Sequence, residues 1–161
     1  MRKLLFLVLL ITTTQSYSQV YDSVLFTKVQ INGIFCGTKK EALLKKFGEP
    51  QKTITTENNK GADIFIDYQY DKSTLRINPV GVFNGFKLTG DQFVLRYLQH
   101  SIKVGDSIKE FAIYFPNSFN AWSKDATGKF KLKIRQSRNA YIVFKTKDGV
   151  VTQITTWEDP D

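Results

Sequence analysis

The chain has 161 residues, and 23 Lys and Arg against 15 Asp and Glu give it a formal net charge of +8 at pH 7. Its single cysteine excludes an intramolecular disulfide, so an apolar core has to stabilise the fold, and 13 Phe and 7 Tyr can contribute to it. The sequence has no metal-ligand cluster, nucleophile elbow or phosphate loop, so no cofactor is expected and few enzyme classes remain.

Residues 1–18 have the pattern of a secretory signal peptide. Arg2 and Lys3 precede an unbroken apolar run, and Ser16 and Ser18 are small residues at the two positions that a signal peptidase reads. The pattern predicts cleavage after Ser18 and a periplasmic or secreted mature protein. The apolar run is too short to span a bilayer and no later run is long enough, so no membrane span is expected.

The mature chain remains moderately basic after the loss of Arg2 and Lys3. An acidic partner surface or a polyanion is one explanation of this charge, and solubility alone is another. Nucleic acid is a poor candidate as a partner, because the protein is expected to be exported and no binding motif interleaves its basic residues.

The first elements in chain order are an extended segment and a short amphipathic helix. Residues 24–31 are expected to form a strand that leads into a helix over 38–47. The apolar face of this helix consists of Leu43, Leu44 and Phe47. Thr38 with Glu41 three residues later is a capping-box pattern, and Gly48 is expected to end the helix.

Alternating residues predict strands after this helix. In the run 64–70, one face carries Ile64, Ile66, Tyr68 and Tyr70, and the other carries Phe65, Asp67 and Gln69. Residues 58–61 before this run are expected to form a loop. Shorter strands are expected over 74–77 and 86–88, with Asn84 and Gly85 as a tight turn or bulge before the second.

A second strand and helix open the other half of the chain. The strand is expected over 93–99, and the helix buries a stripe of four apolar residues, Ile108, Phe111, Ala112 and Phe115. Asp106 or Ser107 is expected to cap this helix and Pro116 to end it.

The remaining residues predict a loop and a group of strands. The loop is expected over 123–128, and the strands over 129–135, 141–145 and 150–157. Asp148-Gly149 between the last two strands is a strong signal for a hairpin turn.

Displacing the sequence by 68 residues aligns the two helices without a gap. The aligned pairs are Ile34 with Ile102, Gly37 with Gly105, Thr38 with Asp106, Leu43 with Phe111, Leu44 with Ala112 and Phe47 with Phe115. The alignment predicts two copies of one unit, over 19–89 and 90–157, followed by an acidic tail at 158–161. The expected fold class is α+β, a tandem duplication of a short helix region packed on an antiparallel sheet.

The lone cysteine, Cys36, precedes the first helix, where a thiol can become an activated nucleophile. In the alignment it falls on Val104, and a buried free cysteine behaves as a small hydrophobic residue. The only histidine, His100, has no local signature that ties it to the thiol. Cys36 is therefore interpreted as part of the core, with a reactive thiol as the alternative.

The residues around the first helix carry a resemblance to a family. The pattern Gly37-Thr38-x-x-Glu41-x-Leu43, closing with Phe47-Gly48-x-Pro50, resembles the superfamily of the SmpA/OmlA-type outer-membrane-assembly lipoproteins. The duplicated layout is similar to the beta-lactamase inhibitor protein-like members, which are built from two such units. The resemblance implies a beta-lactamase inhibitor protein-like fold that binds proteins through its sheet face or a loop. It implies no catalytic residues.

The most distinctive surface feature is a run of cations on one strand. Alternation places Lys129, Lys131, Lys133 and Arg135 on one face, with three apolar residues on the other. Such a face can bind an acidic partner, or it can be a solvated face or a lysine-protected edge. Trp122, beside the loop expected over 123–128, is either an interface anchor or a cap on the core.

These observations favour a non-enzymatic, exported protein-binding module of the cell envelope. The expected contact residues are Lys129, Lys131, Lys133, Arg135 and Trp122. A secreted inhibitor of a hydrolase is the first alternative, and a small thiol enzyme that uses Cys36 with His100 is the second.

Overall fold

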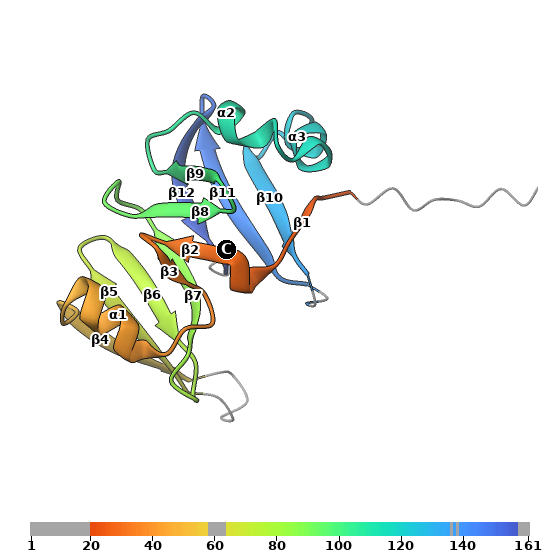
Figure 1. The fold of residues 1–161 in the computed structure, drawn as a ribbon. Coiled ribbons are helices and arrows are strands. Elements are labelled where there is room, and N and C mark those ends of the chain that lie inside the picture. The colour runs from red at the N-terminus through yellow and green to blue at the C-terminus, as the bar shows by residue number, and fades with distance from the viewer. Residues whose placement is uncertain (1–19, 58–63, 136, 138, 158–161) are drawn as a thin grey trace, which may run out of the picture.

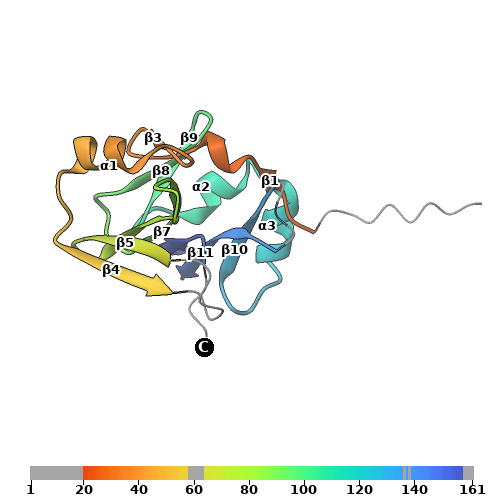
Figure 2. The ribbon, with the colours of Figure 1, turned by 90° about the horizontal axis from the view of Figure 1, so that it is seen from below.

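The structure is a computed structural model that describes residues 20–57, 64–135, 137 and 139–157. The expected leader over 1–18, the loop over 58–61 and the tail over 158–161 lie outside these residues. The described part is an α+β fold of two layers. An eight-stranded sheet forms one layer, and short helices together with a four-stranded sheet form the other (Figure 1 and Figure 2).

The large sheet contains strands from both halves of the chain. Its spatial order is β1 (Ser23–Val24), β10 (Lys129–Ile134), β11 (Tyr141–Lys147), β12 (Val150–Thr155), β7 (Phe83–Leu88), β6 (Ser73–Ile77), β5 (Ile64–Tyr70) and β4 (Lys52–Glu57). All neighbours are antiparallel except β1 and β10. The strands β7 and β12 pair at its centre, so the two halves share one continuous sheet.

The small sheet was not expected. Its order is β3 (Ile34–Phe35), β2 (Val29–Ile31), β8 (Val94–Tyr97) and β9 (His100–Lys103), all antiparallel. The single strands expected over 24–31 and 93–99 are wrong in detail. A 3-10 helix (Phe26–Lys28) interrupts the first, and each segment is the first arm of a tight hairpin. Positive φ angles at Asn32 and Leu98 make these turns possible.

The first helix, α1 (Lys40–Phe47), begins differently from the capping-box prediction. Lys39 occupies the cap position, and no side chain caps the helix. The carbonyl of Thr38 instead accepts a 2.8 Å hydrogen bond from the Phe83 amide, because this segment pairs with the start of β7. The predicted end is confirmed: Gly48 has a φ of 76° and donates its amide to the Leu44 carbonyl.

The second helical region is two helices, α2 (Ile108–Ala112) and α3 (Pro116–Trp122). The predicted apolar stripe is confirmed, since all four of its residues are buried. The prediction that Pro116 ends a helix is wrong, because Pro116 is the first residue of α3. Proline suits that position, where its missing amide hydrogen has no helical acceptor to lose. Trp122 is accordingly the last residue of a helix.

Strand predictions based on alternation are largely confirmed. The Asp148-Gly149 turn has positive φ at both residues and joins β11 to β12. Asn84 is a bulge, because the register passes from Arg76 opposite Gly85 to Ile77 opposite Phe83. The strand β4 was missed. Five of its six residues are exposed, so it lacks an alternating apolar face.

The core lies between the two layers and extends along the whole molecule. Its largest fully buried side chains include Phe83, Phe86, Phe130 and Phe144. The ring centroids of Phe130 and Phe144 are 5.4 Å apart, and both rings contact Phe111 of α2. Cys36 belongs to this core at 2% exposure, as predicted.

The same backbone hydrogen bonds recur at positions 68 residues apart. The Gly37 amide donates to the Phe83 carbonyl, as the Gly105 amide does to the Val151 carbonyl. The Lys40 amide donates to the Gly81 carbonyl, as the Ile108 amide does to the Gly149 carbonyl. The Phe83 amide donates to the Thr38 carbonyl, as the Val151 amide does to the Asp106 carbonyl, and all six bonds measure 2.8–2.9 Å. The isolated bridges Lys39–Val82 and Ser107–Val150 have the same displacement. In each half, these bonds tie the start of a helix to a strand of the large sheet.

The variants Gly37→Ala and Gly105→Ala are each expected to lower the free energy of unfolding by about 1–2 kcal/mol. Both glycines precede a helix at φ angles of 92° and 96°, where an L side chain is strained. Urea unfolding followed by circular dichroism measures the change. Lys45→Ala, at an exposed position of α1, is the control and should change the free energy by less than about 0.5 kcal/mol. Wild-type stability of both glycine variants would contradict the prediction.

Candidate binding surface

The helices and the small sheet cover only one face of the large sheet (Figure 2). We call the other face the open face. Because Phe130 and Leu132 of β10 and Phe144 of β11 lie in the core, the residues that alternate with them point to the open face. Across the strands these are Lys129, Lys131, Lys133, Tyr141, Val143, Lys145, Gln153, Thr155, Gly85, Lys87, Thr74, Arg76, Phe65, Asp67 and Gln69.

The predicted basic strand lies on this open face. Lys131 and Lys133 of β10 are directly opposite Val143 and Tyr141 of β11. Lys129 is opposite Lys145, so the cationic surface extends onto the second strand. Arg135 follows the end of β10, is exposed, and donates its amide to the Val24 carbonyl at 2.8 Å. The structure thus places three of the four predicted cations, Lys129, Lys131 and Lys133, on one face of the sheet, and Arg135 directly after the end of the same strand.

One carboxylate stands close to the basic strand. Asp125 lies in the turn before β10 and accepts a 2.8 Å hydrogen bond from the Thr127 hydroxyl. This bond and the Thr127 amide lower the pKa of Asp125, and the charge of Lys131 lowers it further by a smaller amount. Asp125 therefore remains ionised and offsets part of the positive charge at one end of the strand.

At the middle of the open face, Arg76 is held between an acid and two aromatic rings. Its Nε and Nη2 donate to Oδ1 and Oδ2 of Asp67, both at 2.7 Å. Its Cζ lies 4.1 Å from the ring centroid of Trp157 and 5.6 Å from that of Phe65. Such a bidentate pair with cation–π contacts fixes both the guanidinium and the indole.

A hollow of about 470 Å³ separates the basic strand from this cluster. Val143 and Tyr141 line it from β11, Trp157 and Thr156 from the end of β12, and Lys131 from β10. Val143 is 3% exposed but does not belong to the core, because its side chain is buried on the open face. We call this cavity the open-face hollow.

Trp122, the remaining predicted contact residue, lies on the opposite side of the sheet. Its ring packs against Phe119, with centroids 5.7 Å apart, and against the core. Its Nε1 donates to the Thr146 hydroxyl at 3.3 Å. The structure therefore does not bring Trp122 together with the basic strand.

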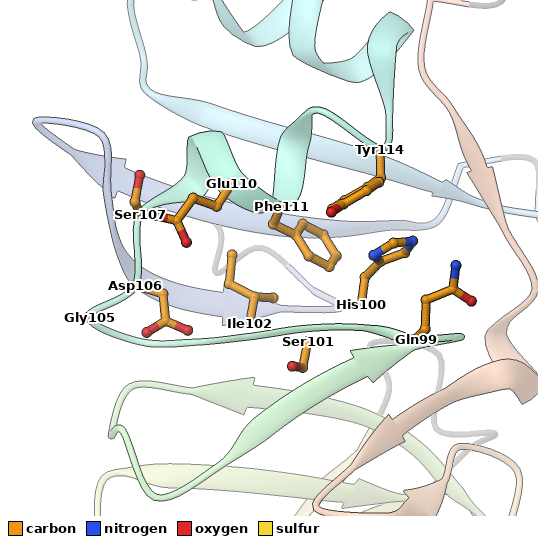
Figure 3. A pocket seen from close by; sticks show the side chains of 10 residues that line it. All are labelled: Gln99, His100, Ser101, Ile102, Gly105, Asp106, Ser107, Glu110, Phe111 and Tyr114. Carbon is orange, nitrogen blue, oxygen red and sulfur yellow. The ribbon is translucent and has the colours of Figure 1, made fainter.

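A second hollow, of about 570 Å³, lies between β9 and α2 (Figure 3). The His100 ring stacks on Tyr114 with centroids 3.6 Å apart. Asp106 and Glu110 also line this hollow, but Asp106 already accepts a hydrogen bond from the Lys103 amide at 2.9 Å. The lining is mostly polar and has no lysine or arginine, in contrast to the open face.

The thiol–imidazole pair that the second alternative requires does not form. Cys36 follows β3 and His100 lies on β9, at opposite edges of the small sheet. Two strands separate them, which corresponds to roughly 14 Å at about 4.8 Å per strand. Burial also raises the pKa of the Cys36 thiol far above its usual range, so the thiolate is disfavoured.

Within the described residues, no group of three or more His, Cys, Asp or Glu side chains is placed to hold a metal ion. In the same part of the chain, no helix has the length and apolar character needed to cross a membrane. No family model, curated protein or solved structure matches the chain.

The Cys36 thiol is expected to react with DTNB at least about 1,000-fold more slowly in the native protein than in the urea-unfolded chain. A residue in the core reacts only through rare opening, and a stable domain is unfolded in about one molecule in a thousand or fewer. Absorbance at neutral pH follows the reaction. Rapid labelling of the folded protein would contradict the buried position and would support the thiol-enzyme alternative.

Arg76→Met is expected to lower the free energy of unfolding by about 1–3 kcal/mol. Asp67, whose side chain is 11% exposed, would lose its bidentate partner, and a buried charge without a partner is costly. Urea unfolding at pH 7 measures the change. Arg96→Met, at an exposed position of β8, is the matched control. Equal effects of the two variants would contradict a structural role for the Arg76 cluster.

Proposed function

We propose that the protein is an exported, non-enzymatic binding protein of the cell envelope, and that it holds an acidic protein partner on the open face. The observation that carries this proposal is the row of lysines beside the open-face hollow. A sheet face with aligned cations and an apolar recess has the two features of a protein interface, a polar rim and an apolar centre.

The arrangement of charge favours an acidic partner. Lys131, Lys133 and Lys145 lie on neighbouring strands, and within the described residues none of them forms an ion pair. Their summed potential would attract a negatively charged surface and accelerate its association, an effect that falls with salt. The Arg76 charge contributes less, because Asp67 already compensates it.

The state of the lone thiol supports a non-enzymatic role. Cys36 is buried in the core, and His100 stacks on Tyr114 at the far edge of the small sheet. Neither side chain is placed to activate the other. Within the described residues, Cys36 and His100 therefore do not form the catalytic pair that a thiol enzyme would need.

The export signal supports a location outside the cytoplasm. Residues 1–18 combine a basic start, an apolar run and small residues before the expected cleavage site. We propose that the mature chain begins at Gln19 and acts in the periplasm or outside the cell.

We propose further that the chain is a tandem duplication, with units over 19–89 and 90–157, in a layout like that of the beta-lactamase inhibitor protein-like superfamily. The recurrence of backbone hydrogen bonds at a displacement of 68 residues supports it. The order of the small sheet is also symmetric about β2 and β8, and the large sheet has three corresponding strands on each side of its centre, β12-β11-β10 and β7-β6-β5; its edge strands β1 and β4 do not correspond. One duplication would explain both regularities.

The double variant Lys131→Glu, Lys133→Glu is expected to reduce capture of the partner at least about 10-fold, which is about 1.4 kcal/mol of binding free energy. Reversal replaces attraction by repulsion at the centre of the basic strand. The measurement is affinity capture by the mature protein from envelope extracts of its own cells, quantified by mass spectrometry.

The matched control is Lys45→Glu, Lys46→Glu, which reverses two exposed lysines on α1, away from the open face. It makes the same change in net charge and should leave capture unchanged. Equal losses for both double variants would assign the effect to net charge, and no loss for either would remove the basic strand as the contact surface. Circular dichroism shows that each variant is folded.

A further inference from the structure

The floor of the open-face hollow is apolar although it lies outside the core. Val143 is opposite Lys131 on one side and opposite Thr155 on the other. Its side chain is 3% exposed and points away from the helices. An apolar floor among lysines favours an apolar group as its occupant, since a carboxylate placed there would lose its hydration.

The two aromatic walls of the hollow are fixed by contacts outside it. The Tyr141 ring makes an edge contact with Tyr21, with centroids 5.6 Å apart and planes at 77°. The Trp157 ring is held by Arg76, which Asp67 holds in turn. An occupant would therefore meet walls that are already ordered, so less side-chain entropy is lost on binding.

Within the described residues, the positive charge around the hollow lies mainly on the side of β10. Lys131 lines it, and Lys133 is directly opposite the Tyr141 wall. On the other side, the charge of Arg76 is compensated by Asp67. An occupant with acidic neighbours is attracted toward β10, whereas one with basic neighbours is repelled.

We infer, on the basis of the proposed function, that the open-face hollow is the anchor site for the partner. It receives one aromatic side chain of an exposed protein segment whose flanking residues are Asp or Glu. The ring enters between Tyr141 and Trp157 above Val143, and the flanking carboxylates face Lys131 and Lys133. The volume of about 470 Å³ lies within the usual range of ligand pockets, and central apolar anchors supply most of the energy of typical interfaces.

Three peptides test the inference in titrations of the ¹⁵N-labelled mature protein followed by NMR. They are a phenylalanine flanked on each side by two aspartates, an alanine with the same flanks, and a phenylalanine flanked by lysines. The acidic phenylalanine peptide is expected to bind at least 10-fold more tightly than either other peptide. Its largest shifts should occur at the Val143 and Tyr141 amides and the Trp157 indole.

Two variants separate the anchor from the charge. Trp157→Ala removes one wall of the hollow. It is expected to lower the affinity for the acidic phenylalanine peptide at least 10-fold, to that of the alanine peptide. Lys131→Gln should lower the affinities for the two acidic peptides by the same factor. Trp122→Phe, at the tryptophan on the opposite side of the sheet, is the control and should leave all affinities unchanged. The NMR spectrum of each variant shows whether it is folded.

Equal affinity of the two acidic peptides would overturn the anchor site while leaving the acidic partner of the proposed function intact. Shifts confined to the hollow of His100 and Tyr114 would overturn it as well. A third outcome combines two results: the acidic phenylalanine peptide binds at the expected site, and the variant Lys131→Glu, Lys133→Glu captures the partner as well as the wild type does. This outcome would support the anchor site and remove the basic strand from the proposed function.

Discussion

The antiparallel pairing of β7 with β12 is the contact on which the rest of the structure depends. It places Leu88 opposite Ile154 and Lys87 opposite Thr155, and so joins the strands of both halves into one sheet. One sheet has one buried face, on which the helices and hairpins of both halves pack as a shared core. It also has one open face, and therefore cations of β10 and the Arg76 cluster belong to the same surface.

Gly85 shows how this junction shapes that surface. A Cβ atom at this position of β7 would lie 2.7 Å from the Thr156 hydroxyl and 3.1 Å from the Trp157 ring, so a side chain here would displace the hydroxyl and crowd the indole. Glycine weakens the interior of a strand, and it often marks a place where another group approaches closely. Here the approaching group is the Trp157 indole, which extends from the end of β12 and stacks on Arg76. The wall of the open-face hollow thus depends on a residue of the other half of the chain.

The sequence predicts what is encoded within one element. Alternation over β10 places its lysines on one face, and the periodic stripe of α2 marks its buried side. The small sheet could not be predicted in this way, because β2 and β8 have only three and four residues and are stabilised by pairing with each other. The Arg76 cluster could not be predicted either, because its members Asp67, Arg76 and Trp157 come from three separate segments of the chain. Of the two alternatives for Trp122, packing on the core is the one observed, because α3 brings its ring against Phe119 and the core.

The lysines of the basic strand repel one another and so destabilise the sheet. Lys129 is directly opposite Lys145, and like charges across a strand pair destabilise a sheet. The fully buried Phe130 and Phe144 beneath them provide apolar burial that offsets this repulsion. The same repulsion disfavours the stacking of two open faces, which their apolar hollows would otherwise promote. Under the proposed function, an acidic partner surface would relieve the repulsion and cover the hollow, so one set of charges would both select the partner and oppose self-association.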